Sequence, residues 1–163
     1  MTEPSAGWEG RFLEDFVVGD VYRHAHGRTI TETDNTWFTM LTNNTQDIHF
    51  NADYASRTEF GRPRVVSTLT LAIVTGLSVA DVSQNAVANL GWDDIKLPAP
   101  VFAGDTIYAE SEVLEVRPSR SRPGQGIVRV RTRGFNQRGE TVVSYERTVL
   151  VYSRASRPRP AAG

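Results

Sequence analysis

The chain has 163 residues, 39% of them apolar and 23% charged, which suits one domain with a sizeable core. A formal net charge of −1 gives no global attraction to nucleic acid or to an anionic membrane. The absence of cysteine excludes disulfides, a thiolate nucleophile and a thiolate metal site in this chain. No signal pattern opens the sequence and no apolar run has membrane-spanning length, so we expect a cytoplasmic protein.

The N-terminal part predicts a loose leader at residues 1–9, followed by one domain over 10–153. A strand is expected over residues 21–30. His24 and His26 stand two apart, so on a strand they share a face. No third ligand stands at a suitable spacing, so we interpret both as surface residues and expect no metal or organic cofactor. Residues 154–163, rich in Pro, Arg and Ala, predict a disordered tail.

Two short helices flank a polar stretch over residues 42–51. Thr31 is the expected N-cap of the first helix, with acidic residues in its first turn. Asn51 is the expected cap of the second, which runs to about Thr58. Phe60 to Arg64 then forms a loop shaped by glycine and proline.

His49 lies in this polar stretch between two apolar residues, Ile48 and Phe50. A half-buried imidazole can change its charge near neutral pH, which suits proton transfer. The alternative is a hydrogen-bonded packing residue among Asn, Thr and Gln side chains that close turns.

Residues 67–80 form the most apolar segment, which predicts a helix enclosed by the rest of the domain. The later part of the chain is β in character, with strands expected over 86–97, 106–117, 127–135 and 141–152. In the third of these, Val128, Val130 and Thr132 alternate with Arg129, Arg131 and Arg133. A hairpin turn is expected at 136–139.

This order predicts an α+β fold in which an antiparallel sheet wraps around a long central helix. One such unit leaves a sheet edge unpaired. A second copy would cover that edge, so we expect a homodimer or a higher homo-oligomer.

Three segments carry a resemblance to a known family. Asn44 to Asn51 resembles its Asp-x-Asn-Pro-Ile/Leu-His-x-Asp motif, and Phe60 to Ser67 resembles its Phe-x-x-Pro-Ile-Val-His-Gly segment. Leu97 to Thr106 resembles its Phe-x-x-Pro-Val-x-x-Gly-Asp-Thr segment. The chain is thus similar to the MaoC-like, (R)-specific enoyl-CoA hydratase/dehydratase family over about residues 10–152, and the resemblance implies a single hot-dog fold.

The resemblance implies addition or removal of water across the 2,3 double bond of an enoyl-CoA. His49 matches the catalytic histidine of the family, and the backbone N–H of Ser67 matches its oxyanion donor. Thr75 matches the hydroxyl residue that steadies the family's acidic group. Asn44 stands where the family has an aspartate, and an amide cannot accept a proton at neutral pH. Either Asn44 orients a water for His49, or Asp47 supplies the carboxylate if this stretch is extended.

The pattern around residues 10–16 and 27–35 resembles the branch that acts on mesaconyl-CoA and itaconyl-CoA, which implies a short, branched or dicarboxylic acyl group. Arg62 and Arg64 are candidates to bind its free carboxylate. Arg120 and Arg122, with Arg117, are candidates for the CoA phosphates. Two alternatives stay open, a hot-dog acyl-CoA thioesterase and a non-catalytic acyl-CoA-binding module, the latter favoured by Asn44.

Overall fold

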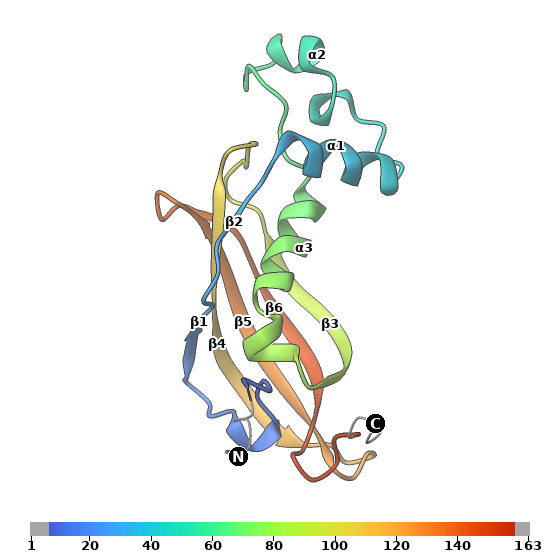
Figure 1. Ribbon diagram of the computed structural model, residues 1–163, viewed down its shortest axis with the longest axis vertical. Helices are drawn as coiled ribbons and strands as arrows, with labels where there is room; N and C mark the ends of the chain where they lie inside the picture. The colour runs from blue at the N-terminus through green and yellow to red at the C-terminus, as the bar shows by residue number, and fades with distance from the viewer. Residues whose placement is uncertain (1–6, 159–163) are drawn as a thin grey trace, which may run out of the picture.

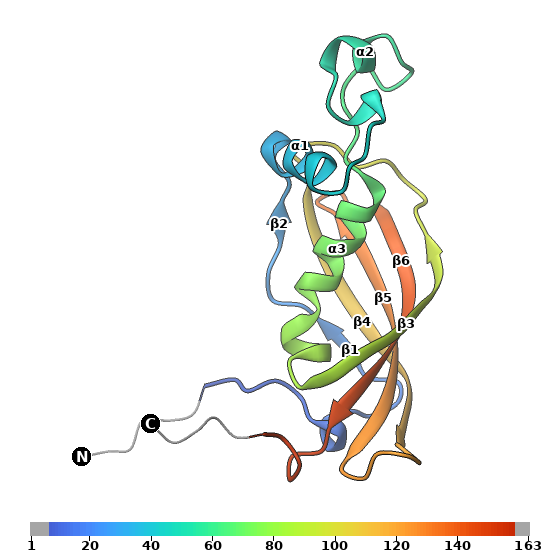
Figure 2. The ribbon, with the colours of Figure 1, turned by 90° about the vertical axis from the view of Figure 1, so that its right-hand side faces the viewer.

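The structure is a computed structural model that describes residues 7–158. A six-stranded sheet runs along the molecule, and one helix lies along one of its faces (Figures 1 and 2). The strand order is β1-β4-β5-β6-β3, with β2 beside β4, and every pair is antiparallel. The strands are β1 Val21–Arg23, β2 Arg28–Thr29, β3 Ala86–Lys96, β4 Thr106–Pro118, β5 Gln125–Asn136 and β6 Thr141–Tyr152.

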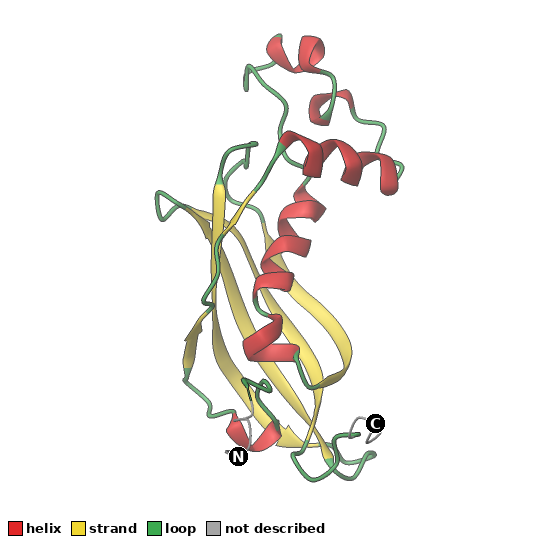
Figure 3. Ribbon diagram, in the orientation of Figure 1, coloured by secondary structure: helices red, strands yellow, loops and turns green. Residues whose placement is uncertain are grey.

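Three α-helices accompany the sheet: α1 Glu32–Leu41, α2 Ala52–Ser56 and α3 Ser67–Leu77. Helix α3 packs on the sheet and continues into a π-helical turn, Val79–Ser83. Helices α1 and α2 project beyond the end of the sheet, with a short 3-10 helix, η2 Asp47–His49, between them (Figures 1 and 3). We call residues 32–62 the overhang. No helix within residues 7–158 is long and apolar enough to span a membrane.

The predicted helix caps are confirmed. The Thr31 hydroxyl accepts from the Asp34 N–H, and the Asp34 carboxylate accepts from the Thr31 N–H at 2.8 Å. This capping box fixes the start of α1. The Asn51 side chain accepts from the Tyr54 N–H and opens α2.

Alternation along the long strands separates an inner face, toward α3, from an outer face. On β5, Val128, Val130 and Thr132 are fully buried, whereas the three arginines between and after them face outward and pair with glutamates of β4 and β6. The predicted alternation is therefore confirmed. Gly134 lets α3 approach closely, because a Cβ there would stand 2.4 Å from Val74.

The strand predicted over residues 21–30 is interrupted, and the interpretation of His24 and His26 as surface residues on one face is wrong for His24. The chain leaves the strand after Arg23, which breaks the alternation: His24 is 7% exposed, while His26 is exposed. The His24 Nδ1 lies 2.9 Å from Asp81 Oδ2, and its Nε2 lies 2.9 Å from the fully buried Ser111 hydroxyl. Both ring nitrogens therefore have hydrogen-bond partners, which join the sheet to the segment that follows α3.

Helix α3 is not enclosed on all sides. One row of residues, four apart along α3 and the π-helical turn after it, is exposed: Thr68, Ala72, Gly76 and Ala80. Its opposite side carries Thr70, Val74 and Ser78, all buried against the sheet. In this chain the sheet covers only one side of the helix.

The folded contacts extend past both predicted domain limits. Trp8 donates its indole N–H to the Ala80 carbonyl at 3.1 Å, so residues 8 and 9 of the predicted leader meet the domain. Arg154 donates to both carboxylate oxygens of Asp15, at 2.7 and 2.6 Å, so the predicted tail contacts it too. Residues 1–6 and 159–163, the remainder of those two segments, lie outside the described residues.

Asp81 contacts both the buried His24 and Arg11, and these two neighbours change the pKa of the Asp81 carboxyl. Burial alone raises the pKa of this carboxyl, but hydrogen bonds from His24 and Arg11 outweigh that effect and lower it below the usual value. A lowered folded-state pKa means that the ionised group stabilises the fold above about pH 4 and that this contribution is lost on further acidification.

We therefore expect Asp81→Asn to lower the free energy of unfolding at neutral pH by about 1–3 kcal/mol, the range for a hydrogen bond to a charged group. The deficit should shrink as the pH falls toward about 3. Urea unfolding at the two pH values measures both, with Asp93→Asn on the exposed part of β3 as control. An equal deficit at both pH values would contradict the assigned role of the charge.

Candidate active site

His49 is fixed in orientation by the loop that leads into α3. Its Nδ1 lies 2.8 Å from the carbonyl oxygen of Arg64. A carbonyl can only accept, so Nδ1 carries the proton and, in the neutral ring, Nε2 is left as an acceptor. The ring is partly buried and lines a cavity of about 210 Å³ in the overhang. This is the arrangement of a histidine prepared to take a proton.

Asn35 ties this histidine to the start of α3. Its side-chain amide donates to the His49 carbonyl at 2.7 Å and to the Arg64 carbonyl at 3.0 Å. Its Oδ1 accepts from the Val66 N–H at 2.9 Å, and the residue is only 4% exposed. This role of Asn35 was not predicted from the sequence. The sequence signal for this role is a polar residue on the buried side of α1. That position alone does not identify the backbone groups that the side chain binds.

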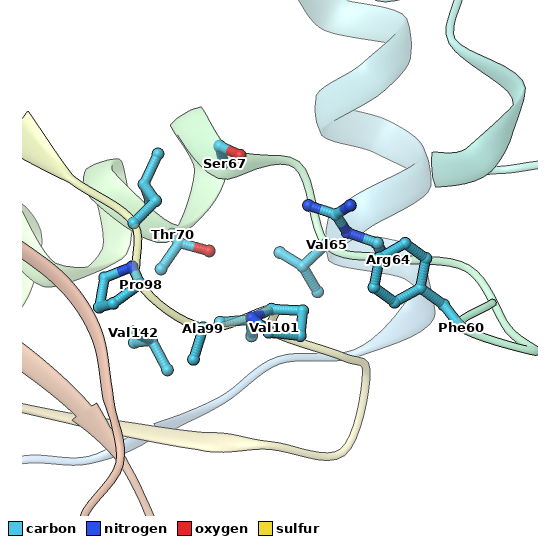
Figure 4. Close-up of a pocket in the computed structure, with 11 residues that line it drawn as sticks. Phe60, Arg64, Val65, Ser67, Thr70, Pro98, Ala99, Val101 and Val142 are labelled. Carbon is cyan, nitrogen blue, oxygen red and sulfur yellow. The ribbon is translucent and has the colours of Figure 1, made fainter.

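A second cavity, of about 140 Å³, opens beside the N-terminus of α3 (Figure 4). Val66 at the N-cap provides no side-chain cap, so the first N–H groups of α3 have no such acceptor. Figure 4 shows Arg64 extending its guanidinium group toward Ser67, with the Thr70 hydroxyl directed into the same space. A helix N-terminus, two hydroxyls and a cation favour an oxygen atom that carries negative charge.

The two predicted arginines of the loop lie at different cavities. Arg62 lines the His49 cavity, stacked over Phe102 at 4.1 Å, and Arg64 lines the cavity at α3, stacked over Phe60 at 4.4 Å. Neither forms a salt bridge with any residue in 7–158. Their charge is therefore available to an anionic ligand.

Asn44 and Asp47 have local partners. The Asn44 Oδ1 accepts from the Gln46 N–H at 3.1 Å, and the residue lines a third cavity, which shares Thr36 and Phe50 with that of His49. Asp47 begins η2, so the stretch is not extended and the premise that would put Asp47 on the face of His49 is wrong. Its carboxylate accepts instead from Asn51 Nδ2 at 3.3 Å.

Two groups of predicted residues lie apart from these cavities. The Thr75 hydroxyl is 3.1 Å from the Tyr145 hydroxyl, and no hydrogen bond joins it to Asn44. Arg120 and Arg122 lie in the loop between β4 and β5, at the end of the sheet opposite the overhang (Figure 1). A single chain thus brings together His49, Arg62, Arg64 and Ser67, but not Thr75 or the basic loop.

Comparison with protein families identifies the relationship. The family model described as mesaconyl-CoA hydratase matches residues 5–160. The chain belongs to the mesaconyl-CoA hydratase family. Its member from Cereibacter sphaeroides, a mesaconyl-CoA hydratase, is 37% identical over 93% of this chain and 44% of its own length.

Solved structures agree with the family. A MaoC domain protein dehydratase from Chloroflexus aurantiacus superposes with a TM-score of 0.88 at 34% identity, over 98% of this chain and 46% of that one. A Mycobacterium tuberculosis protein with a double hot-dog fold gives a TM-score of 0.81 at 20% identity, over 95% of this chain and 53% of that one. The predicted hot-dog fold is confirmed, and the chain spans about half the length of the curated family members it matches.

The variant Asn35→Asp tests how this chain orients the His49 ring. The aspartate keeps the acceptor for the Val66 N–H but loses both donations, to the His49 and Arg64 carbonyls. We expect nitrogen NMR of the wild type to show the Nδ1–H tautomer at His49, and the variant to show a mixture. His26, which is exposed, is the internal reference. An unchanged tautomer in the variant would show that Asn35 has no part in orienting the ring.

Proposed function

We propose that this chain is a hydratase/dehydratase that adds or removes water across the 2,3 double bond of a short enoyl-CoA, branched or dicarboxylic as in mesaconyl-CoA, with (R) stereochemistry. The single observation that carries the proposal is the His49 ring, held through Nδ1 by the Arg64 carbonyl while that same loop delivers the N-terminus of α3. One short segment thus links a proton acceptor and an oxyanion site. Family membership supports the substrate class.

Each step of hydration finds a matching group. Water attacks Cβ while Nε2 of His49 takes its proton, and the protonated ring then delivers that same proton to Cα, which returns His49 to its neutral form. The thioester oxygen gains enolate charge, which the Ser67 N–H at the start of α3 stabilises together with the guanidinium of Arg64. Asn44 lies in the adjoining cavity, where its amide can orient the water without accepting a proton. No cofactor takes part in this scheme.

We also propose a homodimer that completes the site. Strand β3 is a sheet edge, and large apolar side chains are exposed along it and directly after it: Leu90, Trp92, Ile95 and Leu97. An open apolar edge of this kind is a pairing surface. Overhang residues Trp37, Met40 and Leu41 are also 66–79% exposed, beyond the chain's own sheet. A second copy across β3 would cover both surfaces.

One specific observation favours a second candidate, a non-catalytic acyl-CoA-binding module: Asn44 cannot titrate. The decisive assay offers crotonyl-, mesaconyl- and itaconyl-CoA, and follows enoyl-thioester absorbance beside free thiol. Loss of absorbance without thiol release supports hydration. Thiol release indicates a thioesterase, and binding without either change indicates the module.

His49→Ala should lower turnover about 10²- to 10⁴-fold while leaving the fold intact, because it removes the proton carrier. Asn44→Ala should cost less, since it removes only an orienting amide, and Asn44→Asp should preserve or raise activity. Asp47→Asn should be near wild type because the Asp47 carboxylate is engaged with Asn51. Wild-type hydration by His49→Ala would mean that the active site lies elsewhere.

Sedimentation tests the dimer. The wild type should be dimeric at micromolar concentration, and Ile95→Glu should shift it toward monomer by placing a charge among the exposed apolar side chains of β3. Val18→Glu introduces the same charge at a comparably exposed site outside β3 and should stay dimeric. A monomeric wild type would refute the proposal.

A further inference from the structure

Arg147 is the one charged residue among the large side chains that are fully buried within residues 7–158. Its relative exposure is 0%, and none of its three guanidinium nitrogens has a hydrogen-bond partner in that part of the chain. Arg129, Arg131 and Arg133 of the same sheet all pair with glutamates on the outer face. Among the residues that the structure describes, no carboxylate pairs with Arg147 on the inner face.

An unpaired buried guanidinium is costly, because burial removes its water and no protein group within residues 7–158 replaces it. Burial lowers the pKa of the Arg147 side chain, yet an arginine remains protonated at neutral pH. Arg64 differs, because only its Nε is buried without a partner and its side chain lines an open cavity where water can solvate the charge. Of the two, Arg147 is the one whose surroundings require an anion from outside the chain.

The position of Arg147 in the sheet indicates the direction from which that anion would enter. Alternation along β6 puts Arg147 on the face of Tyr145, whose hydroxyl meets Thr75 of α3. Residues 145 and 147 stand about 7 Å apart along the strand, comparable to the length of a four- or five-carbon chain. In register, Arg147 lies opposite Trp92 of the open edge strand β3, which is 40% exposed. The inner face is therefore open to solvent one strand away.

Within one chain, the distance from the start of α3 to Arg147 is too long for a short acyl group. Ser67 and Thr75 are eight residues apart on α3, about 12 Å along its axis. Arg147 stands two residues further along β6 than Tyr145, the partner of Thr75. A ligand that uses both His49 and Arg147 must therefore span two copies, entering past β3 with the overhang of the partner.

We propose that Arg147 binds the free carboxylate of a dicarboxylic acyl group, whose thioester end is held by the overhang of a second copy. A guanidinium takes a carboxylate through two parallel hydrogen bonds, which would fill the vacant donors of Arg147. The inference rests on the proposed function in one respect, that the ligand is an acyl-CoA. Arg147 is covered in the free chain, so side chains over it shift when the carboxylate enters.

Binding of saturated thioesters tests this without turnover. Titration calorimetry should compare succinyl-CoA, which has a terminal carboxylate, with butyryl-CoA, which lacks one. We expect the wild type to prefer succinyl-CoA by about tenfold or more, the scale of hydrogen bonds to a charged group. Arg147→Met should erase this preference and leave butyryl-CoA binding unchanged.

Two further variants separate the alternatives. Arg131→Met makes the same change on the outer face, where the side chain is 53% exposed, and should keep the preference. If Arg64→Met erases the preference and Arg147→Met keeps it, the carboxylate binds at the start of α3 and the proposal is overturned. Equal binding of both thioesters by the wild type also overturns it while leaving acyl-CoA binding intact. Binding of neither overturns the acyl-CoA ligand and this inference together.

Stability provides an independent readout. Replacing an unpaired buried charge with a methionine of similar volume should leave the urea midpoint equal or higher. Arg147→Gln decides the question if Arg147→Met does not fold. A lower midpoint with an unchanged thioester preference would mean that Arg147 is a structural residue only. A hydratase assay run in parallel keeps the two proposals distinct, because thioester preference does not depend on hydration.

Discussion

The hydrogen bonds of Asn35 hold three parts of the molecule in one geometry: α1, the His49 loop and the entry to α3. The overhang reaches beyond the sheet, so it has little sheet surface against which to pack (Figure 3). Its geometry depends on these polar contacts more than on apolar burial. The buried amide uses both of its N–H donors and its oxygen, and these bonds are directional. They position the Val66 N–H at the entry to α3 and the Arg64 carbonyl, which in turn fixes the tautomer of His49. The proposed chemistry depends on this one side chain.

Charged side chains are paired on the outer face of the sheet, whereas one on the inner face is not. On the outer face, Arg131 and Glu146 pair at 2.8 Å, and this hydrogen bond lowers the pKa of Glu146. Such exposed pairs contribute little to stability individually, but they leave no unmet charge. On the inner face, His24 and Asp81 satisfy each other, whereas Arg147 has no partner within residues 7–158. Arg147 is the one guanidinium in that part of the chain with all three nitrogens buried and unpartnered, and this contrast is the basis for the proposed carboxylate ligand.

The open edge strand β3 connects these observations. The curated family members that match this chain are about twice as long, and the exposed apolar side chains of β3 form the surface a second hot-dog unit would cover. Tyr145 and Arg147 lie on the inner face of β6 and Thr75 faces them from α3, away from His49 of their own chain. Association across β3 would let residues that one chain keeps apart serve one site.

The sequence by itself determined the elements whose causes are local. The Thr31 and Asn51 caps, the alternation on β5 and the hairpin at 136–139 depend on residues a few positions apart, so short-range pattern was sufficient. The motif around His49 also indicated the family, because its residues are consecutive in the chain. The tertiary structure alone decided the burial of His24, because its partners Asp81 and Ser111 are 57 and 87 residues away. It likewise decided that η2 is helical and that Asn35 binds three separate backbone groups. The vacancy at Arg147 depends on which face of which strand lies against α3, and sequence spacing carries no information on contacts between such distant segments.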